Sequence, residues 1–181
     1  VLHAGGKFGE GGYKVSGGLH GVGISVVNAL SKCMSVEVSR DGKIHHIAFE
    51  RGNITEPLKI VGTTSLTGTT VNFLPDDEIF PVTTFNYDTL KHRLRELAFL
   101  NPGITITLTD ERQEVEGKFL MNSFHFEGGI RSFVEHLNRK KTKLNDKPIY
   151  FNGRRDDAVV EIALQYNDSY QENIFSYVNN I

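Results

Sequence analysis

Residues 16–23 read Ser-Gly-Gly-Leu-His-Gly-Val-Gly, a glycine run that leads directly into a helical pattern over residues 21–31. Backbone N–H groups at a helix start lie beside the positive end of the helix dipole. Glycine lets the chain approach a ligand where a Cβ would collide. The stretch therefore indicates a phosphate-binding loop followed by a helix. The apolar residues that recur at helical spacing are Val22, Val26, Ala29 and Leu30.

Two better-known phosphate loops do not fit this stretch. A Rossmann turn follows a hydrophobic strand, whereas the residues before Ser16 are polar and rich in glycine. No Walker A pattern occurs, because Lys7 and Lys118 are each followed by phenylalanine. The glycine spacing alone is a weak signal, and a loop with a purely structural role remains the alternative at this point.

Beyond the helix, alternating apolar and polar residues predict an antiparallel sheet. Residues 34–40 and 43–50 read as strands joined by a two-residue turn at Asp41 and Gly42. Two further strands are expected over residues 58–61 and 69–74. Later in the chain the pattern predicts helices over residues 87–100 and 130–137, and strands over residues 104–109, 160–166 and 172–178. These elements predict an open sandwich of helices and sheet.

The composition limits the classes of function. The chain has 181 residues, of which 39% are apolar, enough for one core or two small ones. With 20 basic and 22 acidic side chains the net charge is −2, so any DNA contact must be local. The single cysteine, Cys33, forms no internal disulfide, and we expect it to pack inertly in a reducing cytoplasm. We expect no membrane partner and no metal site, because long apolar runs and ligand-spaced Cys or His motifs are absent from the sequence.

The ends of the chain, one basic run and three histidines also carry expectations. The chain lacks an initial methionine and stops within an apparent strand, so we expect a fragment of a longer protein. The basic run at residues 139–143 is either a contact for DNA phosphates or, as we favour, a solvated helix end. His45, His46 and His125 have no ligand-spaced partners and are expected to lie on strand surfaces or to pack.

Longer motifs carry a family resemblance. Residues 2–8 (Leu-His-Ala-Gly-Gly-Lys-Phe), 13–23 and 25–30 resemble the ATP lid and the following helix of the ATPase subunits of bacterial type II DNA topoisomerases, gyrase and topoisomerase IV. Further similarity lies at residues 67–69, 93–101, 126–130 and 171–174. The match runs along essentially the whole chain, and residues 93–101 are more similar to the gyrase B branch than to topoisomerase IV.

The resemblance implies an α+β fold, the GHKL (Bergerat) ATPase sandwich of antiparallel sheet and helices, followed by part of an α/β transducer domain. A composition shift near residues 123–129 places the expected boundary between residues 1–122 and residues 123–181. The implied activity is ATP binding and hydrolysis that drives negative supercoiling of double-stranded DNA by strand passage. The alternatives are topoisomerase IV, a mismatch-repair or chaperone ATPase of the same superfamily, or a noncatalytic nucleotide-binding module.

The resemblance also assigns residues to the ATP site. Backbone amides of residues 19–23 are expected around the triphosphate, with Lys7 near the phosphates and Tyr13 near the ribose and adenine. Thr69 is expected to reach the adenine through water and its hydroxyl, and Val71 to line the pocket. Arg40 corresponds to the arginine at the pocket mouth that aminocoumarin inhibitors contact. The full ATP-binding set is Gly6, Lys7, Tyr13, Gly18, Leu19, His20, Gly21, Val22, Gly23 and Thr69.

The remaining parts of the family's machinery are expected outside this chain. The general base and the asparagine that holds Mg²⁺ are expected upstream, and the transducer lysine that contacts the γ-phosphate beyond Ile181. The chain alone is therefore expected to be inactive as an ATPase. The implied partners are double-stranded DNA, the gyrase A protein, a second copy of the ATPase region and aminocoumarin-type inhibitors, in the cytoplasm.

Overall fold

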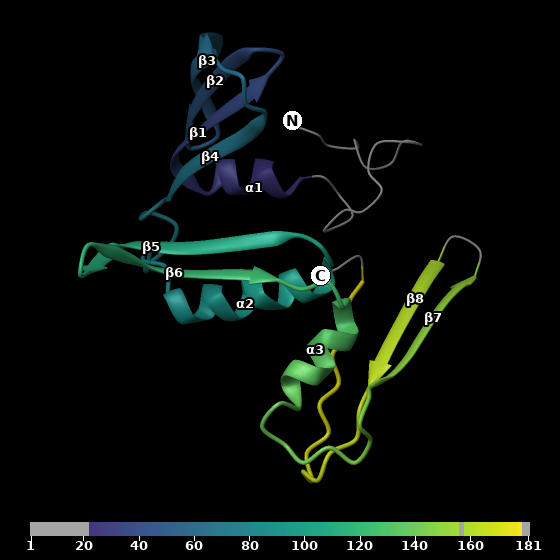
Figure 1. Cartoon of the computed structure of the whole chain (residues 1–181). Helices are drawn as coiled ribbons and strands as arrows, with labels where there is room; N and C mark the ends of the chain where they lie inside the picture. Colours follow the sequence, from purple (N-terminus) through teal and green to yellow (C-terminus); the bar gives the residue numbers. More distant parts are fainter. Residues whose placement is uncertain (1–21, 156–157, 179–181) are drawn as a thin grey trace. The chain divides into compact units, whose positions relative to one another are not determined.

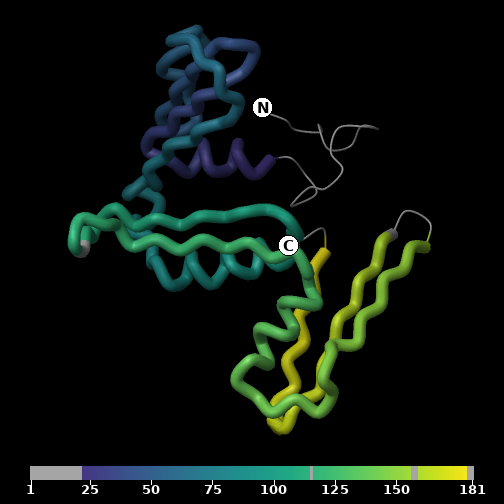
Figure 2. Tube along the Cα trace, viewed as in Figure 1, coloured from purple at the N-terminus to yellow at the C-terminus, as the bar shows by residue number. Residues whose placement is uncertain are grey.

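The protein is described here from a computed structural model that covers residues 22–155 and 158–178. The chain packs into two compact units, one that runs to Thr84 and one that begins at Phe85 (Figures 1 and 2). Unit 1 contains α1 and the first four strands, and unit 2 contains the remaining helices and strands.

Unit 1 is a four-stranded antiparallel sheet with the strand order β3-β2-β1-β4, preceded by α1, which contacts β1 (Figure 1). Two of its connections are two-residue turns, Asp41-Gly42 and Arg51-Gly52, in which all four residues have positive φ. Such turns match the twist of the flanking strands and make tight hairpins. The elements are α1 (Gly23–Ala29), β1 (Ser31–Arg40), β2 (Lys43–Glu50), β3 (Asn53–Thr63) and β4 (Gly68–Pro75).

The two faces of this sheet differ in polarity. Met34 in β1 stands opposite Phe49 in β2 and Phe73 in β4, and Met34 and Phe49 are buried. Because directly paired residues share a face, this face is apolar. The other face carries Glu37 and His46, whose Oε1 and Nδ1 atoms lie 3.3 Å apart. The core of unit 1 therefore lies on the Met34 face.

Unit 2 is built from two hairpins and two helices. Helix α2 packs along the β5-β6 hairpin and against α3, and α3 in turn contacts β8. Asn86 caps α2, because its Oδ1 accepts a hydrogen bond from Thr89 N–H at 2.9 Å, and the chain turns away after the helix through Gly103 (φ 81°). The elements are α2 (Tyr87–Leu100), β5 (Thr105–Val115), β6 (Lys118–His125), α3 (Gly129–Leu137), β7 (Ile149–Arg155) and β8 (Ala158–Leu164).

An aromatic cluster forms the core of unit 2. Phe99 on α2 is 1% exposed and stacks on Phe126, with ring centroids 3.6 Å apart. Phe133 on α3 lies 5.2 Å from Phe99 and also meets the ring of Phe175 edge-on at 5.4 Å. The cluster therefore holds α2, the end of β6 and α3 together.

The antiparallel α+β fold predicted from the sequence is confirmed, and β2 and α2 have the predicted bounds. The strand predicted over residues 172–178 is wrong. Strand β8 pairs with β7, from Ile149 opposite Leu164 to Arg155 opposite Ala158. Residues 171–178 form no strand, because Phe175 and Tyr177 pack on Phe133 instead. Strand β7 was not predicted, since Gly153 and two arginines conceal its alternation.

Several boundaries also differ from prediction. The helix predicted to run to residue 31 ends at Ala29, and β1 begins at Ser31 rather than at residue 34. Strands β3 and β5 are longer than their apolar segments, because pairing continues through polar residues. The predicted domain boundary between residues 122 and 123 falls within β6, whereas the two compact units meet at Thr84 and Phe85. The assignment of the two domains stays a prediction.

Candidate functional site

Five of the predicted site residues lie in the part of the chain that the structure describes, and all five belong to unit 1: Val22, Gly23, Arg40, Thr69 and Val71. The other predicted ATP-binding residues lie outside the described residues: Gly6, Lys7, Tyr13, Gly18, Leu19, His20 and Gly21.

The start of α1 is free of acidic side chains. Val22 is the N-cap residue, and its carbonyl accepts a hydrogen bond from Val26 N–H at 3.0 Å. Among the described residues no side chain caps the helix, and its first turn contains no Asp or Glu. A Cβ added at Gly23 would meet no described atom within 4 Å. The first N–H groups of a helix need hydrogen-bond acceptors, and an anion such as a phosphate supplies them.

Thr69 and Val71 project from the same face of β4. Thr69 stands opposite Val38 of β1, and Val71 stands opposite Val36. This is the apolar face of the sheet, and Val71 is 39% exposed on it. The neighbouring Thr70 points to the other face, because strand side chains alternate. The apolar face thus presents a hydroxyl beside valine side chains, which suits a flat, mostly apolar ring that also forms hydrogen bonds.

Arg40 ends β1 on this same face, two residues beyond Val38. It stands opposite Lys43, and its Nε lies 3.5 Å from Asp41 Oδ2, with 77% of its side chain exposed. An ion pair this exposed holds its arginine weakly. Arg40 therefore lies at one end of the surface that carries Thr69, with a side chain that can swing towards a ligand.

A second charged group, which sequence reasoning did not identify, lies at the other end of the sheet. Arg51 donates from Nε to Asp76 Oδ2 at 2.7 Å, and it also pairs with Glu78. Asp76 is only 2% exposed. The Arg51 guanidinium, and then the backbone N–H of Glu78, hold the pKa of Asp76 below its ordinary value. Asp76 directly follows the strand end at Pro75, and this position is the only signal that the sequence offered.

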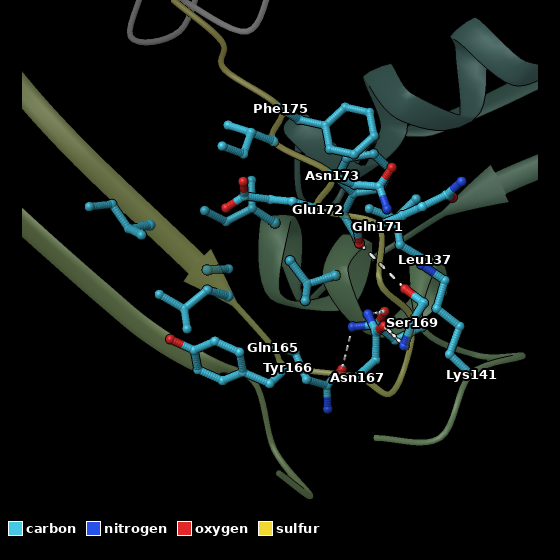
Figure 3. A pocket seen from close by; sticks show the side chains of 18 of the residues that line it. Leu137, Lys141, Gln165, Tyr166, Asn167, Ser169, Gln171, Glu172, Asn173 and Phe175 are labelled. Carbon is cyan, nitrogen blue, oxygen red and sulfur yellow. Dashed lines mark hydrogen bonds between the residues drawn. The ribbon is translucent and has the colours of Figure 1, made fainter. Parts of the chain in front are cut away.

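Unit 2 contains a separate pocket of about 830 Å³ (Figure 3). Helix α3, strand β8 and the segment that follows β8 line it, and none of the five described site residues does. Its amides bond to one another: Asn138 Nδ2 donates to Gln165 Oε1 at 3.1 Å, and Asn167 Nδ2 donates to Asn138 Oδ1 at 2.9 Å. These bonds tie the segment after β8 to the end of α3.

Neither a metal site nor a membrane-spanning helix occurs within residues 22–155 and 158–178. In this part of the chain no group of three or more His, Cys, Asp or Glu side chains is arranged to hold a metal ion. No helix there has the length and apolar character needed to cross a membrane. The histidines singled out in the sequence lie on strands, His45 and His46 on β2 and His125 on β6.

Known DNA gyrase B proteins are similar to this chain along its whole length. The family described as DNA gyrase B matches residues 129–181. Over its full length the chain is 58% identical to the DNA gyrase B protein of Halalkalibacterium halodurans, 57% identical to that of Staphylococcus aureus and 55% identical to that of Streptococcus pneumoniae. The chain spans 28% of the length of each of these relatives.

A solved structure agrees with the fold. The 43K ATPase domain of Thermus thermophilus gyrase B, in complex with an aminocoumarin, superposes with a TM-score of 0.72 at 39% sequence identity. The match covers 83% of this chain and 40% of that one. The chain matches only a part of each relative, but its sequence identity exceeds 50% over its full length and the fold is shared. The chain therefore belongs to the DNA gyrase B family of bacterial type II topoisomerases.

Proposed function

We propose that the chain forms the ATP lid and one wall of the adenine pocket in a gyrase B ATPase, whose ATP hydrolysis drives negative supercoiling of double-stranded DNA. The observation that carries the proposal is the shared face of β1 and β4, where Thr69 and Val71 stand opposite Val38 and Val36. The wall is half-exposed, offers one hydroxyl among apolar side chains and belongs to the same unit as α1.

The adenine and the triphosphate of ATP each have a counterpart in this unit. The adenine lies against Val71, with the Thr69 hydroxyl bonded to the ring directly or through water. The triphosphate lies at the start of α1, where backbone N–H groups of residues 19–23 and Lys7 neutralise it. The absence of acidic side chains from the first turn of α1 fits this assignment, since a carboxylate there would repel the phosphates. Arg40, at the end of the same face, contacts aminocoumarin-type inhibitors.

Mg²⁺ accompanies ATP in this proposal and neutralises phosphate charge. As the family resemblance implies, its protein ligand and the general base are assigned to other parts of the protein. The gyrase A protein, double-stranded DNA and a second copy of the ATPase region are the proposed partners. The basic run at residues 139–143, just after α3, is a candidate for only a local DNA contact.

Two neighbouring threonines test the adenine wall. Thr69→Ala removes the proposed hydrogen bond, and Thr70→Ala is the matched control on the opposite face of β4. In the complete gene product, Thr69→Ala should weaken binding of a nonhydrolysable ATP analogue by about 5- to 30-fold, the equivalent of about 1–2 kcal/mol for a lost hydrogen bond. Thr70→Ala should change the affinity less than about twofold. Equal affinities for the two variants in calorimetry would remove Thr69 from the site.

Plasmid topology tests the activity as a whole. The complete gene product is combined with its DNA-cleaving partner protein and relaxed circular DNA, with and without ATP. ATP-dependent negative supercoiling is the expected result. Relaxation or decatenation without supercoiling would move the assignment to topoisomerase IV, and ATP binding without any topological change would favour another ATPase of the superfamily.

A further inference from the structure

Two loops hold the junction between α1 and β1 through backbone hydrogen bonds. Arg51 N–H, in the turn between β2 and β3, donates to Ser31 O at 3.2 Å. Asp76 N–H, just after β4, donates to Leu30 O at 3.1 Å. Leu30 is the C-cap residue of α1, so both bonds fix the point where the helix ends.

The side chains of the same two residues join the loops to each other. Arg51 is bidentate on Asp76, with Nε 2.7 Å from Oδ2 and a terminal nitrogen 3.3 Å from Oδ1. Asp76 Oδ1 also accepts Glu78 N–H at 3.0 Å. A bidentate arginine-carboxylate pair fixes orientation as well as distance. The two loops, linked in this way, form a closed clamp around the end of α1, which we call the junction clamp (Arg51, Asp76 and Glu78).

Arg51 has a backbone conformation that a long side chain seldom adopts. Arg51 has φ 48° and occupies the first position of a two-residue turn, where Asn, Asp or Gly is favoured. A long side chain in this left-handed conformation carries a steric cost that a smaller turn residue avoids. Gly52 follows, and a Cβ there would lie 3.6 Å from Ala29 Cα, so the turn also rests on the last residue of α1.

Packing fixes the direction of α1 only in part, because none of its seven residues is fully buried and four are half-buried. At about 1.5 Å per residue the helix is about 10 Å long, so a tilt of about 10° at its end moves its start by about 2 Å. In catalysis, where reacting groups must be aligned, a misplacement of about 1 Å can cost about 100-fold in rate. A small change at the junction is therefore amplified at Val22 and Gly23.

We propose that Arg51 and Asp76 are positioning residues for nucleotide binding: the junction clamp sets the direction of α1 and so places its N-terminal amides against the triphosphate. This inference rests on the proposed ATP site. The clamp acts on the phosphate end of that site, whereas Thr69, Val71 and Arg40 belong to the sheet. The Arg51 guanidinium holds the pKa of Asp76 below its ordinary value, so the pair stays charged into more acidic solution than an ordinary aspartate would allow.

The test compares two ligands on the complete gene product. Arg51→Asn removes the guanidinium but keeps a residue that tolerates the left-handed turn, and Arg51→Lys keeps the charge without the bidentate geometry. Glu116→Asn is the matched control, because Glu116 has φ 52° in a corresponding turn. Affinity is measured for a nonhydrolysable ATP analogue and for an aminocoumarin, and thermal unfolding is followed in parallel.

The expected result for Arg51→Asn is at least a tenfold loss of affinity for the ATP analogue, with less than a threefold change for the aminocoumarin. Arg51→Lys should recover part of the loss, and Glu116→Asn should change neither affinity. Unchanged ATP-analogue affinity in Arg51→Asn, or equal loss for both ligands, would overturn the inference, since the clamp would then serve only the fold. If Arg51→Asn does not fold, Arg51→Lys supplies the same comparison. A wild-type protein that binds the aminocoumarin but no ATP analogue would instead overturn the proposed function.

Discussion

The prediction with the clearest magnitude concerns Phe99, the centre of the aromatic cluster in unit 2. Its ring is 1% exposed and lies within 5.4 Å, centroid to centroid, of the rings of Phe126, Phe133 and His136. A buried phenylalanine removes about 150 Å² or more from water, which at about 25 cal/mol per Å² amounts to about 4 kcal/mol. Phe99→Ala should therefore lower the free energy of unfolding of unit 2 by about 3–5 kcal/mol, in the range found for such substitutions.

Hydrogen exchange followed by mass spectrometry measures this loss separately in each unit. A loss of about 4 kcal/mol corresponds to an about 10³-fold faster exchange of amides that exchange through opening of unit 2. Peptides from α2 and α3 should both show it, and peptides from β1 and β2 should not. Phe119→Ala is the matched control, because Phe119 lies in the same unit but is 46% exposed.

Two outcomes would contradict this reasoning. A loss below about 1 kcal/mol would mean that the cluster does not carry the stability that its burial implies. Faster exchange in α2 without any change in α3 would mean that the two helices open separately, and it would favour the domain boundary predicted between residues 122 and 123. Faster exchange in both supports the unit that begins at Phe85.

Two further predictions concern unit 2. Burial, and then the charges of Arg95, Arg139 and His92, lower the pKa of His136. The unfolded chain then binds this proton more tightly than the folded one, so stability should fall as the pH drops below about 6.5, and His136→Gln should reduce that fall in denaturant titrations. Gly129 has φ 56°, and its Cβ would lie 3.1 Å from Pro102 Cγ, so Gly129→Ala should cost about 1–2 kcal/mol in thermal unfolding. Gly153→Ala in β7, where a Cβ meets no described atom within 4 Å, should cost less, and equal losses would refute the steric argument.

Local signals predicted many elements correctly because their causes are local. The Asp41-Gly42 turn and the alternation around it located β2, and the spacing of leucines with the Asn101-Pro102-Gly103 stop located α2. These patterns act over a few residues, so they are visible without a fold. The pattern failed where pairing depended on distant residues. Strand β7 extends beside β8 despite its glycine and arginines, because β8 offers an apolar partner strand.

The residues of the candidate site also fall into those that local sequence predicted and those that only the tertiary structure brought together. The sequence by itself indicated a helix after residue 21, the hydroxyl and valine on one strand, and the family to which the chain is assigned. The glycine loop predicted before that helix lies outside the described residues. The tertiary structure alone decided that Thr69 stands opposite Val38, and that Arg51 in one loop meets Asp76 in another to hold the end of α1. The physical reason is that composition and spacing encode the helix, strand or turn that each segment prefers locally. Contacts between segments 25 residues apart, as Arg51 and Asp76 are, exist only once the sheet has brought those segments together.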